Sequence, residues 1–519
     1  MIEAVGSSVE IAAINRPIWD MPTRRTSGMG PHRLRCEDVP HLIFFRAALP
    51  AARHTISSDA SLLTSNTWQA LSIYNQQATM TSRFSMDTAA EDIVIAGAGL
   101  AGLAVALGLH SVTCFTRRRR RNLVAASIRK GVRSLVLESS PFLRASGFAF
   151  TTWKNAFRAL DALGIGDKIR KQHLQAQTYV CALLLLNVEQ AARHVLGHRI
   201  NRARSRPRAA GQTVRPPQHA EIRCVRRDLL LQALAEELPK GTIRYSSKIV
   251  SIEEDGNIKI LQLADGSVLI GCDGINSVVA KWLGLAKPSY SGRSAARGFA
   301  HYPDGHGFDP TFLQFTGNGF RAGMMPCNEN DIYWFFTWTP SDNDKGVDEN
   351  ASKMKQFVLD KFRGSKNVPE EALAVIDKSE MSDVLAAPLR FRPPLSLITA
   401  SISKGNVCVA GDALHPMTPD LGQGGCAALE DGVVLARCLG EALAGEDAGE
   451  NERIEAALRE YARIRRWRSV ELIATAYTLG IIQQSDNGII SFLRDKFLSG
   501  ALAGRLLKMA DYDCGTLSN

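Results

Sequence analysis

The stretch that most constrains the fold is Asp92–Gly102, which reads DIVIAGAGLAG. Its apolar run, Ile93–Ile95, has the length and composition of a buried parallel strand. A glycine pattern G-x-G-x-x-G follows, made by Gly97, Gly99 and Gly102. The first glycine permits a tight turn, the second lets the backbone approach a pyrophosphate, and the third lets the next helix lie close to the strand. The stretch predicts a dinucleotide-binding βα unit, although a glycine-rich turn in another α/β protein would have the same local pattern.

A second strand that ends in an acid would complete such a unit, and Val132–Glu138 supplies it. Since a carboxylate there can accept both ribose hydroxyls, Glu138 is the candidate ribose ligand. Glu138 follows Gly97 by 41 positions, whereas the common pattern has roughly 20. Without residues 111–128 the separation would be 23 positions, which predicts an 18-residue exposed insert at the end of the first helix.

The net charge of +10 would suit a protein that binds nucleic acid, but its distribution argues against that. Three segments, residues 1–85, 111–128 and 178–218, together carry +13, so the rest of the chain carries −3. We therefore expect no nucleic-acid partner and interpret the run Arg117–Arg121 as part of the exposed insert.

Cysteine usage and hydropathy limit the class of protein further. The ten cysteines form no C-x-x-C pair, so we expect neither a metal site nor a disulfide framework. Buried, reduced thiols favour an intracellular protein, and the sequence leaves a cytoplasmic or plastid location open. No apolar run approaches the roughly 20 residues that a transmembrane helix needs.

Two further regions have clear patterns. Four strand candidates are separated by turn residues and predict an antiparallel sheet: Ala295–Tyr302, Thr311–Thr316, Phe320–Met325 and Asp331–Trp338. A last buried strand, Asn406–Ala410, leads through a glycine-rich loop into a helix from Cys426 to Leu443.

Three motifs occur in a fixed order along the chain. They are GAGLAG with Glu138, GCDGINSVVAKWLG at Gly271–Gly284, and AGDALHPMTPDLGQGGCAALED at Ala410–Asp431. In these motifs the chain resembles the para-hydroxybenzoate hydroxylase-like (class A) FAD-dependent monooxygenases, and most of all their plant members. The resemblance implies an α/β fold with a Rossmann-like FAD-binding domain of the GR2 type, an inserted antiparallel-sheet substrate domain and C-terminal helices.

The resemblance also implies the cofactor and its ligands. The cofactor would be FAD, with NAD(P)H as co-substrate. The residues that match the family's FAD-contacting positions are Gly97, Gly99, Leu100, Ala101, Gly102, Glu138, Arg144, Arg226, Asp273, Gly411, Asp412, Pro419, Gly422, Gly424, Gly425 and Cys426. The loop before the last helix would offer backbone N–H groups to the flavin ring, and the sequence identifies no catalytic side chain.

The expected organisation follows from these motifs. The FAD-binding domain would comprise residues 91–177, 221–285 and 401–450, and the substrate domain residues 286–400. The other segments are a disordered extension (1–90), an irregular segment (178–220) and C-terminal helices (451–519).

The activity implied is the hydroxylation or epoxidation of a small aromatic or isoprenoid-like molecule with O2, through a flavin hydroperoxide in a water-shielded pocket. A flavin oxidase or dehydrogenase of the same fold, or a catalytically impaired flavin-binding protein, are the alternatives. Possible pocket residues on the predicted strands are Arg297, Gln314, Tyr333, Phe335 and Thr337. Their alternation does not tell which face of the sheet is inward, and the substrate and oligomeric state stay open.

Overall fold

The computed structural model divides into Met1–Phe84 and Ser85–Asn519, and every described residue belongs to the second unit. The structure describes residues 93–517 except 121–122, 145–147, 182–220, 250–266, 318, 345, 348–349, 366–367, 446–448, 485–504 and 506–507. In residues 113–130 and 178–181 it describes the backbone alone. The expected N-terminal extension, most of the segment 178–220 and the end of the C-terminal helices lie outside the described residues.

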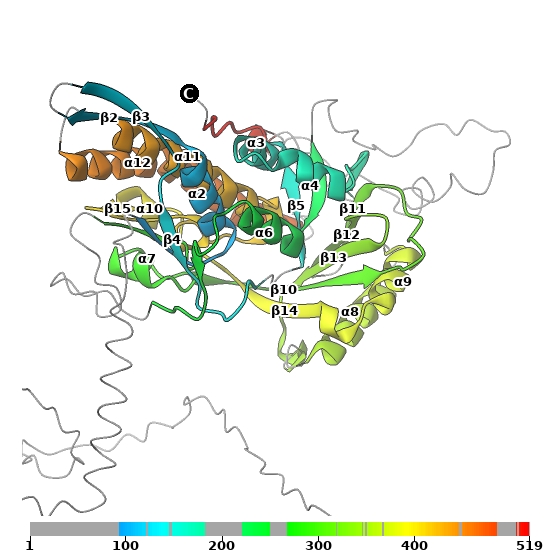
Figure 1. The fold of residues 1–519 in the computed structure, drawn as a ribbon. Coiled ribbons are helices and arrows are strands. Elements are labelled where there is room, and N and C mark those ends of the chain that lie inside the picture. Colours follow the sequence, from blue (N-terminus) through cyan, green and yellow to red (C-terminus); the bar gives the residue numbers. More distant parts are fainter. Residues whose placement is uncertain are drawn as a thin grey trace, which may run out of the picture. The chain divides into compact units, whose positions relative to one another are not determined.

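A mostly parallel sheet is built around β1 (Ile93–Ala96), as the sequence predicts (Figure 1). Its six described strands have the order β15 (Ser403–Lys404), β16 (Val407–Val409), β9 (Val268–Gly271), β1, β4 (Ser134–Leu137) and β8 (Ile243–Arg244). Neighbours are parallel except β15 and β16. β1 lies between β4 and β9, and every residue of β1 is buried. This burial on both faces of the sheet accounts for its unbroken apolar sequence.

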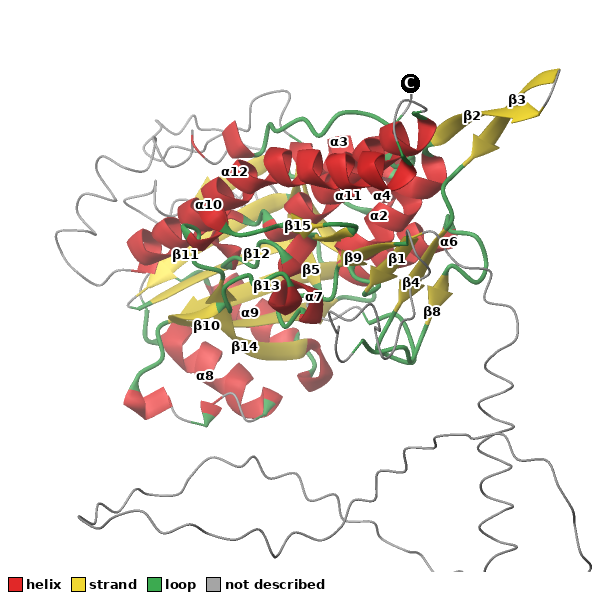
Figure 2. Ribbon diagram, turned by 90° about the vertical axis from the view of Figure 1, so that its left-hand side faces the viewer, coloured by secondary structure: helices red, strands yellow, loops and turns green. Residues whose placement is uncertain are grey.

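A hairpin explains the long separation between Gly97 and Glu138 (Figure 2). It follows α2 (Leu100–Ser111) and consists of β2 (Thr113–Arg120) paired antiparallel with β3 (Leu123–Lys130). The amide of Gly131 donates to the Val112 carbonyl over 3.0 Å, so the chain leaves and re-enters the fold at one point. An insert at this place agrees with the sequence, but the backbone bounds it at 113–130 rather than 111–128.

The second sheet is antiparallel in its centre. Its order among the described strands is β14 (Val384–Phe391), β10 (Ser289–His301), β13 (Asp331–Trp338), β12 (Phe320–Pro326), β11 (Thr311–Gly317) and β6 (Thr178–Cys181), with only the β11–β6 pair parallel. The four predicted strands and their antiparallel pairing are confirmed. The irregular assignment of residues 178–220 is wrong for Thr178–Cys181, because pairing with the distant β11 makes this short piece a strand.

The two faces of this sheet have different neighbours. Ile332, Trp334 and Phe336 of β13 pack in one apolar cluster with α8 (Ala351–Arg363) and α9 (Glu370–Lys378). Their neighbours Tyr333, Phe335 and Thr337 face a cavity on the other side. The structure thereby settles which face is inward, which the alternation alone left open.

The remaining elements connect and cover the two sheets. A two-stranded antiparallel ribbon pairs β5 (Ala149–Trp153) with β7 (Ile222–Arg226). The described helices not yet named are α3 (Lys154–Ala162), α4 (Gly166–Gln172), α6 (Arg227–Glu236), α7 (Val278–Trp282), α10 (Ser396–Thr399), α11 (Gly424–Ala444) and α12 (Glu450–Gln484). Short 3-10 turns are η2 (Asp342–Asp344), η4 (Met381–Asp383), η5 (Gly411–Ala413) and η6 (Pro419–Leu421).

Distant partners define the chain beyond α4 and the pairing of β9. Helix α4 ends at Gln172, and the Ala176 amide beyond it donates to Ile222 O over 2.8 Å. β9 pairs in parallel with β1 on one side and with β16 on the other.

Helices α2 and α11 pack closely at small residues. A Cβ on Gly432 of α11 would lie 2.5 Å from the Cβ of Ala104 on α2, so a larger residue would separate the helices. A Cβ on Gly411 would likewise lie 2.6 Å from the Cβ of Ala101, so the loop before α11 lies against the first turn of α2. Within the described residues, no helix combines the length and apolarity that a membrane crossing requires.

Candidate active site

The glycine turn between β1 and α2 has the geometry that a phosphate cradle needs. Gly97 has φ 98°, and a Cβ there would lie 2.5 Å from the Cys272 carbonyl oxygen. A Cβ on Gly102 would lie 1.9 Å from Gly97 O, whereas one on Gly99 would meet no atom within 4 Å. The turn is thus closed on the protein side and open above Gly99, where the N-terminus of α2 presents its amides.

Glu138 lies beside this turn, as predicted. One carboxylate oxygen accepts the Ala98 amide over 2.9 Å and the other accepts the Ser140 amide over 2.8 Å. Burial raises the pKa of Glu138, but these hydrogen bonds outweigh it and the pKa is lowered. The exposed Arg144 guanidinium lies 3.3 Å from the same carboxylate. Glu138 is therefore an ionised acceptor next to the glycine turn.

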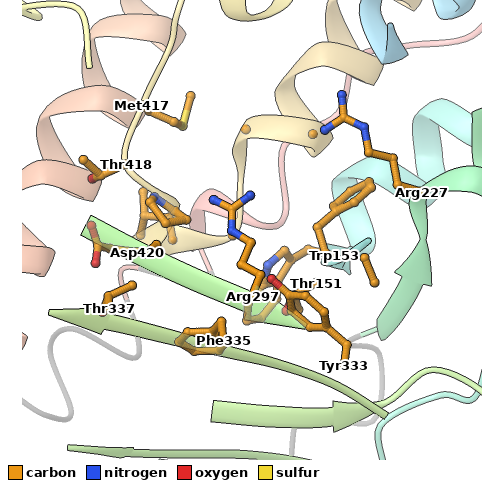
Figure 3. Close-up of a pocket in the computed structure, with 18 of the residues that line it drawn as sticks. Thr151, Trp153, Arg227, Arg297, Tyr333, Phe335, Thr337, Met417, Thr418 and Asp420 are labelled. Atoms are coloured by element: carbon orange, nitrogen blue, oxygen red, sulfur yellow. The ribbon is translucent and has the colours of Figure 1, made fainter. Parts of the chain in front are cut away.

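A cavity of about 200 Å³ lies between the two sheets (Figure 3). Predicted site residues that line it are Leu100, Asp412, Pro419, Gly422, Gly424 and Gly425. Predicted substrate-sheet residues that line it are Arg297, Tyr333, Phe335 and Thr337. Gln314 is buried but does not line the cavity. The cavity therefore brings the last motif and the antiparallel sheet together.

The loop after β16 is held from behind by Asp431 of α11. One oxygen of this carboxylate accepts the Gly411 amide over 2.7 Å and lies 2.7 Å from Nε2 of His415. Burial raises the pKa of Asp431, but His415 and Arg465 lower it more, to about 2. Asp412 is exposed into the cavity while its neighbours in the loop are buried. Its carboxylate is thus presented to a ligand by a fixed backbone.

The last glycines form the other wall of the cavity. Gly422 has φ 62°, and a Cβ on Gly425 would lie 2.6 Å from the Phe150 ring. Helix α11 begins at Gly424, so its first amides lie at the cavity. The buried sulfur of Cys426 lies 3.5 Å from Gly422 O and does not line the cavity, and the predicted role of Cys426 stays a prediction. Burial raises the pKa of this thiol to about 12.

Two predicted residues lie away from the cavity wall. Asp273 accepts the Val278 amide over 2.7 Å through one oxygen, while its other oxygen is buried without a protein partner in the described structure. Arg226 is held by Asp331 over 2.7 Å and by Asp228 over 2.6 Å. These two carboxylates hold Arg226, which does not line the cavity, and its predicted role at the cofactor stays a prediction.

The neighbouring Arg227 was not among the predicted cofactor ligands. It lines the cavity, and its Nε is buried without a partner among the described residues. Burial lowers its pKa, partly offset by the nearby Asp412 carboxylate. The sequence contained a signal for it, because Arg227 lies three, four and seven positions before the buried Leu230, Leu231 and Leu234 of α6.

Sequence reasoning also missed the ribbon strand β5, which supplies one side of the cavity through Ala149, Phe150, Thr151 and Trp153. Its sequence AFTTW is too short and mixed to distinguish it from the start of α3. Beside the cavity, the buried Asp420 carboxylate binds both Arg293 and Arg321. Among the described residues, no cluster of His, Cys, Asp or Glu could hold a metal ion.

Comparison with known proteins agrees with this site. The FAD-binding-domain family matches residues 90–473, and the chain belongs to that family, as a class A FAD-dependent monooxygenase. Monooxygenase 2 of Arabidopsis thaliana is 45% identical over 440 residues, which are 82% of this chain and 98% of the relative. Monooxygenase 1 of the same plant is 33% identical over 82% of this chain and 99% of its own length.

Solved structures show the same fold at lower identity. HpxO from Klebsiella pneumoniae, complexed with FAD and uric acid, has a TM-score of 0.59 and 23% identity, covering 82% of this chain and 97% of HpxO. A tetrameric 2-methyl-3-hydroxypyridine-5-carboxylic acid oxygenase has a TM-score of 0.55 and 20% identity over 82% of this chain and 99% of its own. The expected combination of an FAD-binding domain with an antiparallel sheet domain is confirmed.

Proposed function

We propose that the chain holds FAD along the glycine turn and the cavity, and oxygenates a small organic molecule at the end of the cavity formed by the second sheet. The observation that carries this proposal is that one cavity is lined by Leu100 at the start of α2, by Asp412 and by Gly424 at the start of α11, while the space above the adjacent Gly99 is open. When bound, FAD would accept a hydride from NAD(P)H and activate O2.

The described side chains fit this cofactor. The open surface at Gly99 and the amides of α2 would hold the pyrophosphate, and Glu138 would accept the ribose hydroxyls. Asp412 is a carboxylate free to accept hydroxyls of the ribityl chain. Arg227 has a buried, unpartnered N–H that an anionic or carbonyl oxygen would satisfy. The predicted roles of Arg144 and Asp273 stay predictions.

The protein's own contribution at the reacting end is orientation and exclusion of water. The N-terminal amides of α11 at Gly424 and Gly425 would stabilise negative charge on the ring system that lies against them. Aromatic side chains of the second sheet, among them Phe312 and Phe335, would keep the substrate end apolar. The partners of this activity are a small-molecule substrate and O2, without nucleic acid.

The test is to purify the full chain and record its flavin absorption, its NADPH and NADH oxidation, and its product formed under isotope-labelled O2. The proposal predicts a yellow protein whose product carries the label. Product without label would favour the alternative of an oxidase or dehydrogenase. A protein that retains no flavin would contradict the proposal and favour the catalytically impaired alternative.

A further inference from the structure

The C-terminal segment, residues 508–515, packs onto the helices that carry the loop of residues 411–424. It lies beside α3, where Figure 1 draws it in red. The Ala510 carbonyl accepts the backbone amide of Asn155 over 3.0 Å, and another carbonyl of the segment accepts from Arg468 of α12 over 2.8 Å. The segment is therefore joined to both α3 and α12 by hydrogen bonds of its backbone.

Met509 connects the C-terminal segment with the wall of the cavity. Its side chain is buried and belongs to one apolar cluster with Leu421 of η6 and Ala427 of α11. Met417, which lines the cavity, packs against the same cluster. A side chain of the C-terminal segment thus supports residues 417–421, the part of the loop that borders the cavity.

Tyr512 covers the buried ion pairs of α11 and α12. The centre of its ring lies 4.5 Å from the guanidinium carbon of Arg468 and 5.4 Å from that of Arg465. Both arginines bind Glu430 over 2.8 Å, and the side chains of Arg465 and Glu430 have no exposed surface. Nη1 of Arg465 is buried without a hydrogen-bond partner among the described residues. A ring at these distances attracts both cations and shields them from water.

Glu430 connects these arginines with the start of α11. Its carboxylate accepts from the side-chain amide of Asn155 over 2.6 Å, and the same amide group donates to Gln423 over 2.8 Å. Gln423 is buried and directly precedes Gly424, the cavity-lining residue at which α11 begins. The ion pairs under Tyr512 therefore fix the end of the loop at which the helix amides face the cavity.

Asp431 connects the same arginines with the beginning of the loop. One of its oxygens lies 2.5 Å from Arg465, and the other accepts the Gly411 amide over 2.7 Å. Gly411 directly precedes Asp412, which lines the cavity. Both ends of the loop are thus held by one buried set of charges, and a disturbance of that set would affect both.

We infer, on the basis of the proposed function, that Tyr512 is a positioning residue for the flavin site. By covering the two guanidinium groups, the ring fixes the ion pairs of Glu430 and Asp431, and these hold residues 411–424 in the arrangement that receives the flavin. Without the ring, water would reach the ion pairs and weaken them. The loop would then open more often, and FAD, which binds the closed arrangement, would bind less tightly.

The experiment uses the purified full chain. It measures amide hydrogen exchange by mass spectrometry with and without FAD, FAD affinity by fluorescence titration, and the visible circular dichroism of the bound flavin. The variants are Tyr512→Ala, Tyr512→Leu and Tyr512→Phe. One control, Tyr290→Ala, makes the same truncation at a tyrosine of β10 that is 50% exposed. The other, Asp511→Asn, removes the exposed ion pairs of the C-terminal segment itself.

We expect peptides that cover residues 411–424 to exchange about tenfold faster in Y512A than in the parent, because loss of a cation–π contact shifts an opening equilibrium by about that factor. The Kd for FAD should rise by up to the same factor, with an altered circular dichroism of the bound flavin. Y512L should lie between Y512A and the parent, and gives the test if Y512A does not fold. Y512F, Y290A and D511N should match the parent, as should peptides of β12 and β13 in every variant.

The inference is overturned if residues 411–424 exchange at the parent rate in Y512A and Y512L, or if β12 and β13 exchange faster to the same extent. It is also overturned if the loop opens more often while the FAD Kd and the circular dichroism stay unchanged. A parent that binds no FAD refutes the proposed function instead, and the exchange of residues 411–424 in that protein still shows whether Tyr512 holds the loop.

Discussion

Replacing Asp420 by asparagine would test whether the buried charges behind the cavity are held together as the structure indicates. The Asp420 side chain has no exposed surface, and those of Arg293 and Arg321 are 5% and 6% exposed. Asp420→Asn keeps the volume but leaves two buried guanidinium groups without a negative charge between them. Removing one partner of a buried ion pair costs about 3–5 kcal/mol of folding free energy. We expect a loss in that range.

The assay is urea unfolding, followed by far-ultraviolet circular dichroism and by flavin release. The control is Asp511→Asn, which breaks the contacts of an exposed carboxylate with Lys154 and Arg158. Surface ion pairs contribute about 0–1 kcal/mol, so the control should unfold close to the parent. A loss below about 1 kcal/mol in D420N would refute the reasoning, because it would mean that the two arginines find other partners or water.

The difference in folding stability between the parent and D420N should change with pH in one predictable direction. Burial raises the pKa of Asp420, but Arg293 and Arg321 outweigh it and the pKa is lowered. A lowered carboxyl pKa contributes stability above the unfolded-state value of about 3.9, and that contribution is lost as the pH falls through the folded-state pKa. The stability gap between the parent and D420N should therefore be constant near neutral pH and shrink below about pH 4.

Three other predictions follow from the site. Deletion of residues 113–130, with Val112 joined to Gly131, should leave the flavin content and the thermal midpoint equal to those of the parent. The reason is that Val112 and Gly131, which flank the hairpin, are already joined by a hydrogen bond. Loss of flavin would show instead that the hairpin supports the cofactor site. Arg227→Ala should weaken flavin retention at least tenfold, about 1.4 kcal/mol, whereas Arg226→Ala should lower stability with little effect on flavin affinity in a flavin titration. Cys426→Ala should change flavin affinity less than about twofold, about 0.4 kcal/mol, and a large loss would place its sulfur at the cofactor after all.

The elements that the sequence predicted correctly are those whose signal is local. β1, the glycine turn and α2 follow from an apolar run and three glycines. β6 and β5 were missed because each is a strand of four or five residues stabilised by a distant partner, β11 for β6 and β7 for β5. A sequence of that length has no periodicity of its own, so only the pairing defines it.

The same distinction explains why the site was predicted in part. The glycines and Asp412 are fixed by backbone geometry at a turn, which a motif records position by position. Arg226 and Arg227 are adjacent, and the motif could be matched to either. The two side chains point to different surroundings. Arg226 forms an ion pair with Asp331 on β13, more than a hundred residues away in the sequence, whereas Arg227 continues the face of α6 that buries Leu230 and Leu234. The sequence does not show the ion pair between Arg226 and Asp331, but it does show the helical spacing of Arg227. When a motif contains two arginines at the start of a helix, the arginine that continues the buried face of that helix is therefore the better candidate for a ligand-binding role.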